Sequence, residues 1–337
     1  MNYRVAIAGA TGAVGQEIIK LLALRKFPIK KLVLFGSERS HGKTVKTAFG
    51  DIQVSNFSVD LLDDIDFIFF ATSGEHSKKY APIAAEKGAI VIDNSSAFRL
   101  DKNVPLVVPE VNSNALKSHS GIIANPNCST IQMVVALNPL HQISPIRRIV
   151  VSTYQAVSGA GQAAISELEN QTSALSSGGK VSVNSFTKQI AYNVIPHIDV
   201  FQENGYTKEE MKMVDETKKI LDDPSIRIAA NCVRVPVIRA HSEAINIETQ
   251  DRIGEQKARE ALAACEGITV VDDRQDGGYP TPIDASEKMD TYVGRIREDI
   301  SCDNGLALWV VADQLWKGAA LNAIQIAECL IAEQTAG

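Results

Sequence analysis

Apolar and polar positions alternate in short blocks along the first half of the chain. Compact apolar runs predict strands, and apolar residues at three- and four-residue spacing between them predict helices. This alternation is typical of an α/β fold with a parallel sheet covered on both faces, and right-handed crossovers then give a doubly wound, Rossmann-type domain. The predicted strands are residues 4–8, 31–35, 66–71, 89–92 and 121–124, and the predicted helices are 16–24 and 78–87.

The second half shows strand-like runs that follow one another with little helix between them. This succession predicts a mixed or antiparallel sheet, and therefore an α+β domain. The strand-like runs are residues 148–154, 232–238, 243–249, 292–298 and 307–312, and the candidate helices are 161–172, 208–221 and 317–332. Residues 173–185 are rich in Ser and Gly, which predicts a mobile loop.

Length and composition fit two globular domains that bind small molecules. The 337 residues exceed one average domain, and 45% hydrophobic with 22% charged residues is an ordinary globular balance. The net charge of -6 gives no electrostatic reason to bind nucleic acid or an anionic membrane, so we expect neither partner. Five widely spaced cysteines without a CxxC pair, and no signal sequence or bilayer-spanning run, predict a cytoplasmic protein with reduced thiols and no metal.

A glycine-rich turn joins the first predicted strand to the first helix, and it reads Gly9-Ala-Thr-Gly12-Ala-Val-Gly15. Glycines let the backbone approach a pyrophosphate closely, and the free N–H groups of a helix N-terminus attract its negative charge. A tight turn that merely needs glycine is the alternative. The position between a strand and a helix favours a dinucleotide site.

The residues after the second predicted strand indicate which dinucleotide is bound. NAD enzymes usually place Asp or Glu there to accept a hydrogen bond from the ribose 2′-hydroxyl. Here Arg39, with Ser37, Ser40 and Lys43, offers charge-assisted hydrogen bonds to a 2′-phosphate, which predicts NADP(H). Glu38 would instead favour NAD if it pointed inward, so the strictness of the preference is open, and a solvated surface loop is the plainer alternative.

One cysteine stands at a predicted helix start. The turn Asn125-Pro-Asn127 leads to Cys128, which opens an apolar helix over residues 129–137. The positive end of the helix dipole and nearby N–H donors stabilise a thiolate, which is the nucleophilic form. A buried structural cysteine is the usual alternative. We expect that role for Cys232, Cys265 and Cys329, and an inert surface position for Cys302.

A nucleotide-binding half followed by a helix-start cysteine predicts aldehyde dehydrogenase chemistry. The thiolate adds to an aldehyde, a hydride passes to a nicotinamide, and a thioester remains for phosphate or water to release. The proton transfers need a base, and histidine is the usual choice near neutral pH. His241 is the candidate, because Arg234 and His241 bracket a predicted strand end, although spacing alone excludes none of the other histidines.

Seven segments, in the same order along the chain, resemble the bacterial aspartate-semialdehyde dehydrogenases. Their sequences are closer to the Gram-positive-type branch of that family. The resemblance extends over essentially the whole chain. The segments are Gly9–Gly15, Asp93-Asn-Ser-Ser-Ala-Phe-Arg99, Asn125–Gln132, Gln155-Ala-Val-Ser-Gly-Ala-Gly161, Glu209-Glu-Met-Lys212, Cys232–Ser242 and Lys317–Glu328.

The resemblance implies NADPH-dependent reductive dephosphorylation of L-4-aspartyl phosphate to L-aspartate 4-semialdehyde and phosphate, a step toward lysine, methionine, threonine and diaminopimelate. It implies that Cys128 carries the acyl group, that His241 is the acid/base and that Gln155 orients the substrate. Phosphate would bind to Arg99 and Lys212, the α-carboxylate to Arg234 and the α-ammonium to Glu209. The implied nucleotide contacts, with Gly9 from the turn, are Thr11, Gly12, Ala13, Val14, Arg39, Ser40, Ser158 and Gly159.

The same residues admit plainer roles. Arg99 and Arg234 suit surface ion pairs, and Gln155 suits a strand-end cap. Glu209 and Lys212 stand at i and i+3 of a predicted helix, as an ordinary solvent-facing pair would. Gln314 stands where the family usually carries Asn, so its contact with the nucleotide is an open question.

Two other functions fit parts of the pattern. An N-acetyl-γ-glutamyl-phosphate reductase has the same architecture, but its substrate has no free ammonium for Glu209. A non-catalytic NADP-binding regulator would not need Cys128. We expect an NADP-binding domain at residues 1–127, completed by 313–337, and a catalytic and dimerisation domain at 128–312. The mixed sheet and long loops need cover, which predicts a homodimer or homotetramer.

Overall fold

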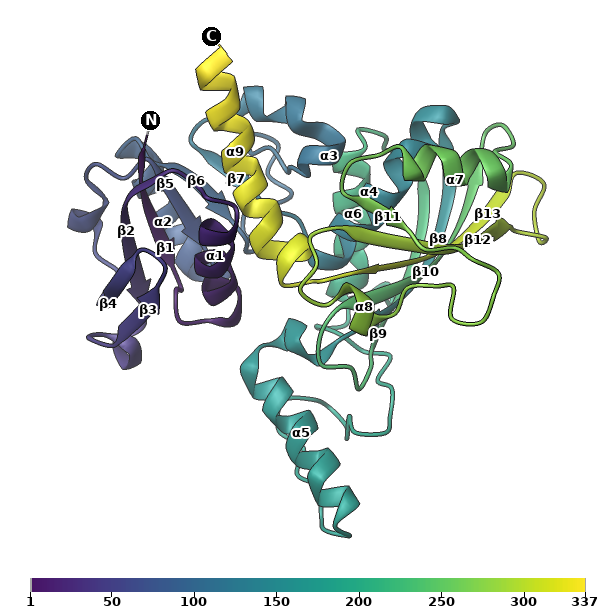
Figure 1. Cartoon of the computed structure of the whole chain (residues 1–337), viewed down its shortest axis with the longest axis horizontal. Coiled ribbons are helices and arrows are strands. Elements are labelled where there is room, and N and C mark those ends of the chain that lie inside the picture. Colours follow the sequence, from purple (N-terminus) through teal and green to yellow (C-terminus); the bar gives the residue numbers. More distant parts are fainter. Residues whose placement is uncertain (1, 337) are drawn as a thin grey trace. The chain divides into compact units, whose positions relative to one another are not determined.

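The computed structural model describes residues 2–336 and divides into two compact units (Figure 1). The first contains the residues up to Asn127 together with those from Ala319 onward, and the second is Cys128–Gly318. The chain therefore leaves the first unit immediately before Cys128 and returns to it immediately after Gly318.

A seven-stranded sheet forms the centre of the first unit, in the order β3-β4-β2-β1-β5-β6-β7. Its neighbours are parallel except for β3 and β4, which form an antiparallel hairpin. The bounds are β1 Tyr3–Ala8, β2 Ile29–Gly36, β3 Thr44–Thr47, β4 Gly50–Asn56, β5 Phe67–Phe70, β6 Ile90–Asp93 and β7 Ile122–Ala124. The predicted parallel sheet is confirmed. The β3–β4 hairpin was not predicted, because its strands are short and mostly polar.

Helices cover both faces of this sheet. The connections β1–α1–β2 and β5–α2–β6 move in opposite directions along the strand order, so right-handed crossovers place α1 and α2 on opposite faces. The C-terminal helix α9 packs against α1 and β6. The helices are α1 Ala13–Leu24, α2 Gly74–Glu86, α3 Pro109–Asn112 and α9 Leu321–Ala336, with 3-10 turns η1 Glu38–Ser40, η2 Val59–Leu62 and η3 Ser113–Ser118.

The second unit is built on a six-stranded mixed sheet, in the order β11-β12-β13-β10-β8-β9. The pairs β8–β9 and β11–β12 are parallel and the others are antiparallel, which confirms the predicted mixed sheet. The strands are β8 Ile146–Gln155, β9 Arg227–Arg234, β10 His241–Thr249, β11 Ile268–Val270, β12 Thr291–Glu298 and β13 Gly305–Ala312. The other elements are α4 Cys128–Ile143, η4 Val157–Ala160, α5 Gln162–Ser176, α6 Lys208–Ile220, α7 Glu255–Ala263, α8 Pro282–Ala285 and the π-helical turn η5 Trp316–Ala320.

Two boundary predictions were wrong. The strand expected to reach residue 238 ends at Arg234, because Pro236 has no N–H for the ladder and the chain turns at Val235–Val237. The loop expected from residue 173 begins only after Ser176, where α5 ends. Buried Glu167 and Gln171 of α5 bind the backbone of Asn184 and Ile190, so the following segment is fastened to the helix.

Candidate active site

The glycine-rich turn of the first unit opens onto a cavity of about 560 Å³. The helix α1 begins at Ala13 with Gly12 as its N-cap, and no side chain of the described residues caps this end. The first N–H groups of the helix therefore face no side-chain acceptor, and the helix dipole favours an anion beside them. Gly9, Thr11 and Gly12 line the cavity.

Close backbone approaches require the first and last glycines of the turn. Gly9 has a φ of +86°, and a Cβ atom there would lie 2.2 Å from the carbonyl oxygen of Ala71. A Cβ atom at Gly15 would lie 2.2 Å from the carbonyl oxygen of Gly9. Both distances lie far inside van der Waals contact, so neither position admits a side chain. This tight, uncapped turn fits the pyrophosphate of a dinucleotide.

The residues after β2 line the same cavity. Ser37 and Arg39 belong to the lining, and the buried Ser40 places its Oγ 3.1 Å from Oγ1 of Thr11. Glu38 lies in the same 3-10 turn, but it is exposed and is not among the residues that line this cavity. The guanidinium and hydroxyl groups at this end of the cavity suit the 2′-phosphate of NADP. A carboxylate in the same place would instead favour NAD.

In the second unit, Cys128 is the first residue of α4 and is partly exposed. A Cβ atom at Gly318 would lie 2.8 Å from the Cβ of Cys128, so only glycine lets the chain pass the cysteine so closely. In the first unit, the turn that leads to Cys128 is anchored through Asn125. Its Nδ2 donates to Oδ1 of Asn94 at 3.1 Å, and its Oδ1 accepts from Nδ2 of Asn322 at 2.7 Å.

The register of the second sheet places three predicted site residues in one row. Arg234 of β9 pairs with Gln155 of β8. In the β8–β10 ladder Tyr154 pairs with Ser242, so His241 lies opposite Gln155 one step further along. Side chains at paired positions point to the same face of a sheet. Arg234, Gln155 and His241 therefore share one face, although they are far apart in the sequence.

His241 is completely buried, and its two ring nitrogens have different surroundings. Nδ1 accepts a hydrogen bond of 3.0 Å from the backbone N–H of Ala156, which assigns the proton of the neutral ring to Nε2. Nε2 is buried and has no hydrogen-bond partner among the described residues. Burial and the charge of Arg234 hold the pKa of His241 well below its ordinary range. His241 is therefore neutral and offers an Nε2–H to a ligand.

Arg234 is buried and is held by the same peptide as His241. Its Nη1 donates to the carbonyl oxygen of Ala156 at 2.7 Å, and this is the only hydrogen bond of its guanidinium within the described part of the chain. Burial lowers the pKa of Arg234, whereas Glu209, Cys128 and Cys232 raise it. A Cβ atom at Gly159 would lie 3.1 Å from Nη1 of Arg234 and 3.2 Å from Nε2 of His241. Glycine at 159 keeps this space clear.

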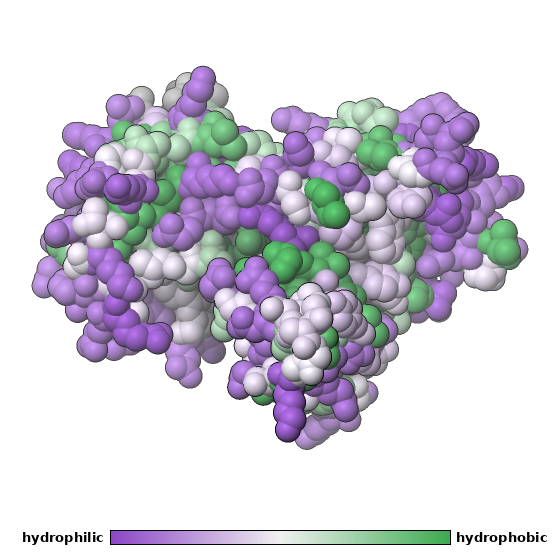
Figure 2. Space-filling model, turned by 60° about the horizontal axis from the view of Figure 1, so that its bottom comes forward, coloured by the Kyte–Doolittle hydropathy of each residue, from purple (hydrophilic) through white to green (hydrophobic). Residues whose placement is uncertain are grey.

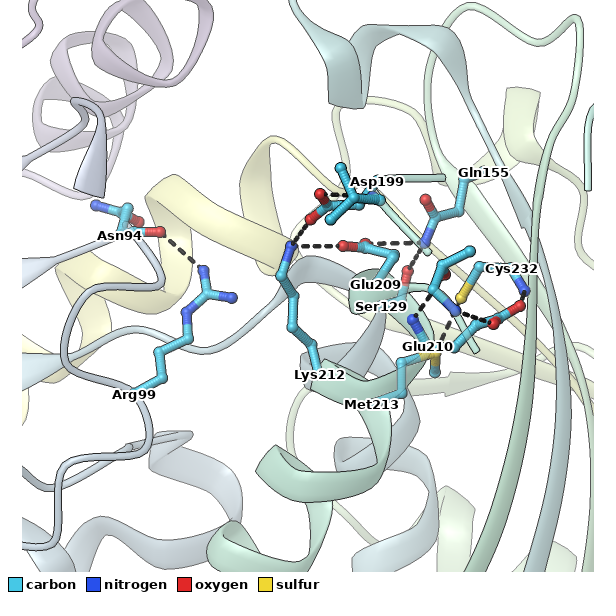
Figure 3. Close-up of polar contacts among 12 residues, drawn as sticks. Asn94, Arg99, Ser129, Gln155, Asp199, Glu209, Glu210, Lys212, Met213 and Cys232 are labelled. Atoms are coloured by element: carbon cyan, nitrogen blue, oxygen red, sulfur yellow. Dashed lines mark hydrogen bonds and ion pairs between the residues drawn. The ribbon is translucent and has the colours of Figure 1, made fainter. Parts of the chain in front are cut away.

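A chain of polar contacts extends from Gln155 through Glu209 and Lys212 to Asp199 (Figure 3). Nε2 of Gln155 donates to Oγ of Ser129 at 2.6 Å and to Oε1 of Glu209 at 3.3 Å. Lys212 continues the chain, with its Nζ 2.9 Å from Oε2 of Glu209 and 2.9 Å from Oδ2 of Asp199. Because Ser129 and Glu209 belong to α4 and α6, these helices cover the face that carries Gln155. Cys128 thus begins a helix that lies over the row.

Two family models match the chain. Residues 4–119 match the one described as "Semialdehyde dehydrogenase, NAD binding domain", and residues 137–317 match "Semialdehyde dehydrogenase, dimerisation domain". An aspartate-semialdehyde dehydrogenase from Aquifex aeolicus is 51% identical over 99% of this chain and 99% of its own length. The chain belongs to the aspartate-semialdehyde dehydrogenase family.

Solved structures agree with this placement in the aspartate-semialdehyde dehydrogenase family. The aspartate semialdehyde dehydrogenase II of Vibrio cholerae, complexed with ASA, superposes with a TM-score of 0.95 at 49% identity and covers 98% of both chains. The aspartate semialdehyde dehydrogenase of Candida albicans with NADP superposes with a TM-score of 0.78 at 26% identity, over 99% of both chains. The resemblance and the α/β fold class expected from the sequence are confirmed, and the chain is an NAD(P)-dependent oxidoreductase that acts on an aldehyde group.

Several residues predicted from the family resemblance have partners inside the protein. In the first unit Arg99 is buried and donates from Nε to the carbonyl oxygen of Asn125 at 2.9 Å and from Nη2 to that of Asn94 at 2.8 Å. In the second unit Oε1 of Gln314 accepts from the N–H of Ala240 at 2.8 Å, and its Nε2 donates to Oγ of Ser158. The amide of Gln314 therefore fixes the turn before His241 together with Ser158.

Among the acids of the second unit that the sequence analysis missed, three bear on the site: the exposed Asp199 and the buried Glu210 and Glu243. Asp199 pairs with Lys212, but it lies outside any helix or strand and has no local signal. Glu210 closes the capping box of α6 with Thr207 and accepts from the N–H of Cys232 at 3.0 Å. The Thr-x-x-Glu spacing could have identified it. Glu243 is fully buried in β10, two residues after His241 and on the same face.

Among residues 2–336, no helix has the length and apolar character needed to cross a membrane.

Proposed function

We propose that the chain reduces L-4-aspartyl phosphate to L-aspartate 4-semialdehyde with NADPH, through a thioester on Cys128. The observation that carries this proposal is the row of Arg234, Gln155 and His241 on one face of the second sheet, covered by the helix that begins with Cys128. A thiol at a helix start, a neutral histidine and a buried guanidinium are the groups that acyl transfer from an amino-acid side chain needs.

In the first step the thiolate of Cys128 attacks the carbonyl carbon of the acyl phosphate. The C–S bond forms, the bond from carbon to the phosphate oxygen breaks, and phosphate leaves with its electron pair. The N-terminal end of α4 stabilises the thiolate and the oxyanion that develops on the substrate carbonyl. Gln155, fixed by Ser129 and Glu209, orients the thioester.

In the second step the thioester is reduced to a thiohemiacetal. The bound nicotinamide cofactor supplies the hydride. The Nε2–H of His241 donates a hydrogen bond to the oxyanion of the thiohemiacetal, which agrees with the tautomer that the Ala156 N–H selects. The oxyanion then re-forms the carbonyl group, the C–S bond breaks, the aldehyde is released, and Cys128 leaves as a thiolate with the electron pair of that bond.

Substrate charges are distributed over named side chains. The planar guanidinium of Arg234 binds the α-carboxylate, and Glu209 binds the α-ammonium. Arg99 and Lys212 bind phosphate. The turn Gly9–Gly15 holds NADP(H), notably through Thr11, Gly12, Ala13 and Val14. The 2′-phosphate of the cofactor binds to Ser37, Arg39 and Ser40. Its nicotinamide end lies beside Ser158 and Gly159. The amide of Gln314 is already hydrogen-bonded to Ala240 and Ser158, so we propose that Gln314 orients Ser158 and does not itself contact the nucleotide.

We infer that the chain acts as a homodimer or a larger homo-oligomer through its second unit. The name of the matching dimerisation domain supports this, as do large exposed apolar side chains around the lobe that carries α5 (Figure 2). Tyr192 is 71% exposed and Phe201 62% exposed, and Val194, Val200 and Tyr206 of the same segment are exposed too, a grouping that is typical of an interaction surface. A monomer in sedimentation at micromolar concentration would contradict the inference. The five cysteines form no disulfide within the described residues, which also favours the cytoplasm.

The decisive assay is phosphate-dependent NADP reduction with L-aspartate 4-semialdehyde. Cys128→Ala should abolish turnover and leave NADPH binding intact, whereas the matched variant Cys232→Ala should remain active. Substantial dehydrogenase activity in purified Cys128→Ala would rule out the thioester. Preference for N-acetyl-glutamate 5-semialdehyde over L-aspartate 4-semialdehyde would instead support the reductase alternative and contradict the role of Glu209.

A further inference from the structure

Lys212 is held by two carboxylates at once (Figure 3). Its Nζ lies 2.9 Å from Oε2 of Glu209 and 2.9 Å from Oδ2 of Asp199. Burial alone would lower the pKa of Lys212, but the two carboxylates of Glu209 and Asp199 outweigh burial and raise it. Burial alone would raise the pKa of Asp199, but the ammonium of Lys212 outweighs burial and lowers it. The ion-pair geometry sets two carboxylates against one ammonium, so the triad carries more negative than positive charge.

A triad with this charge is a poor site for phosphate. An approaching dianion meets two carboxylates for one ammonium, and two donors of Nζ are already engaged. The third donor of Nζ remains for phosphate, but both carboxylates repel a dianion there, and this repulsion falls when one of them gives way. The two carboxylates differ in how readily they can do so.

Asp199 is the partner that can leave. Its side chain is 31% exposed, against 9% for Glu209, and it belongs to a segment outside the helices and strands. Glu209 is built into α6 and also accepts from Gln155. A partly exposed ion pair contributes little to stability, so exchanging Asp199 for another anion costs little.

We propose that Asp199 is a built-in competitor for phosphate at Lys212. Its carboxylate occupies on Nζ the position that a phosphate oxygen takes during the reaction, and it returns when phosphate leaves. In the reductive direction this replacement assists phosphate release, and in the oxidative direction it raises the phosphate concentration that the enzyme requires. The proposal rests on the role of Lys212 given under the proposed function.

The test is the KM for inorganic phosphate in the oxidative direction, measured on the full chain with NADP and L-aspartate 4-semialdehyde. Asp199→Asn should lower the phosphate KM about two- to fivefold and leave the KM values of the semialdehyde and NADP nearly unchanged. Asn suits the position because Asp199 has a φ of +67°, a conformation that Asn tolerates. Should this variant fail to fold, Asp199→Gly serves the same purpose.

Asp222→Asn is the matched control. Asp222 is exposed just beyond the end of α6, has a φ of +51°, and loses the same charge in the same substitution. It should leave the phosphate KM unchanged. An equal decrease in both variants would show that only net charge matters, and would overturn the proposal.

Lys212→Ala separates the proposal from the function on which it rests. If the phosphate KM is unchanged in Lys212→Ala, the assignment of phosphate to Lys212 is wrong. If it rises there while Asp199→Asn leaves it unchanged or raises it, Asp199 supports phosphate binding and the competitor role is wrong. In the double variant the benefit of Asp199→Asn should disappear, because no ammonium remains for which to compete. A benefit that persists would contradict direct competition.

Discussion

Nδ1 of His241 accepts a hydrogen bond of 3.0 Å from the backbone N–H of Ala156, and this contact decides what the imidazole can do. A nitrogen that accepts from a peptide N–H carries no proton in the neutral ring. The catalytic side of the ring, Nε2, is therefore a donor before the substrate arrives. In a protonated imidazolium, the Nδ1–H of His241 and the backbone N–H of Ala156 would both be donors, and this hydrogen bond would be lost.

The first prediction concerns this tautomer. Because burial and Arg234 lower the pKa of His241, the ring should stay neutral from about pH 6 to about pH 9. In protein labelled with ¹⁵N-histidine, Nδ1 should show a shift typical of an unprotonated nitrogen and Nε2 that of a protonated one. Protonated-type shifts for both nitrogens at neutral pH would contradict the assignment.

The second prediction concerns the reactive thiol. Burial, with a further contribution from Glu209, raises the pKa of Cys232 far above its ordinary range, so its thiolate is not available. Iodoacetamide at neutral pH should label Cys128 first and abolish activity at one equivalent per chain. Peptide mapping should show the same labelling in Cys232→Ser and none at residue 128 in Cys128→Ser. Faster labelling of Cys232 than of Cys128 would count against the proposed nucleophile.

The third prediction concerns cofactor choice. Arg39 lines the nucleotide cavity, and losing one charge-assisted hydrogen bond costs about 1.5–3 kcal/mol. Arg39→Ala should therefore weaken NADP binding roughly ten- to a hundredfold and leave NAD binding nearly unchanged, as titration of each cofactor would show. Glu38→Gln is the control at an exposed neighbour and should alter neither affinity strongly. Equal loss of both cofactors in Arg39→Ala would mean that the guanidinium does not contact the 2′-phosphate.

The fourth prediction concerns the buried carboxyl of Glu243. Burial raises its pKa well above the ordinary range, and Gln132 of α4 opposes this only partly. A raised folded-state pKa stabilises the fold below the unfolded-state pKa, and this contribution is lost as the pH rises. Between those two pKa values, wild-type stability should fall relative to Glu243→Gln by up to about 1.4 kcal/mol per pH unit.

Thermal unfolding at about pH 6 and about pH 8 measures this difference. The Tm of Glu243→Gln should exceed that of the wild type by more at the higher pH. Glu248→Gln, in the same strand but on the other face, is the control and should show no such trend. A Tm difference independent of pH would show that Glu243 is ionised in the folded protein.

The sequence alone determined the features that depend on neighbouring residues. The strand, glycine turn and helix at residues 3–24 follow from local spacing, and a side chain at Gly15 would meet the backbone of Gly9, which belongs to the same turn. The helix start at Cys128 was predictable for the same reason, since an Asn-Pro-Asn turn precedes an apolar run. The mixed sheet of the second half was predictable from the succession of strands.

Only the tertiary structure decided how the distant residues meet. Register across β9, β8 and β10 aligns Arg234, Gln155 and His241, and no local pattern specifies register between strands far apart in the chain. The pairing of Asp199 with Lys212 depends on a segment without regular structure that packs beside α6. The state of His241 depends on Ala156, a backbone donor that any residue except proline could supply, so side-chain identity carries no signal for it.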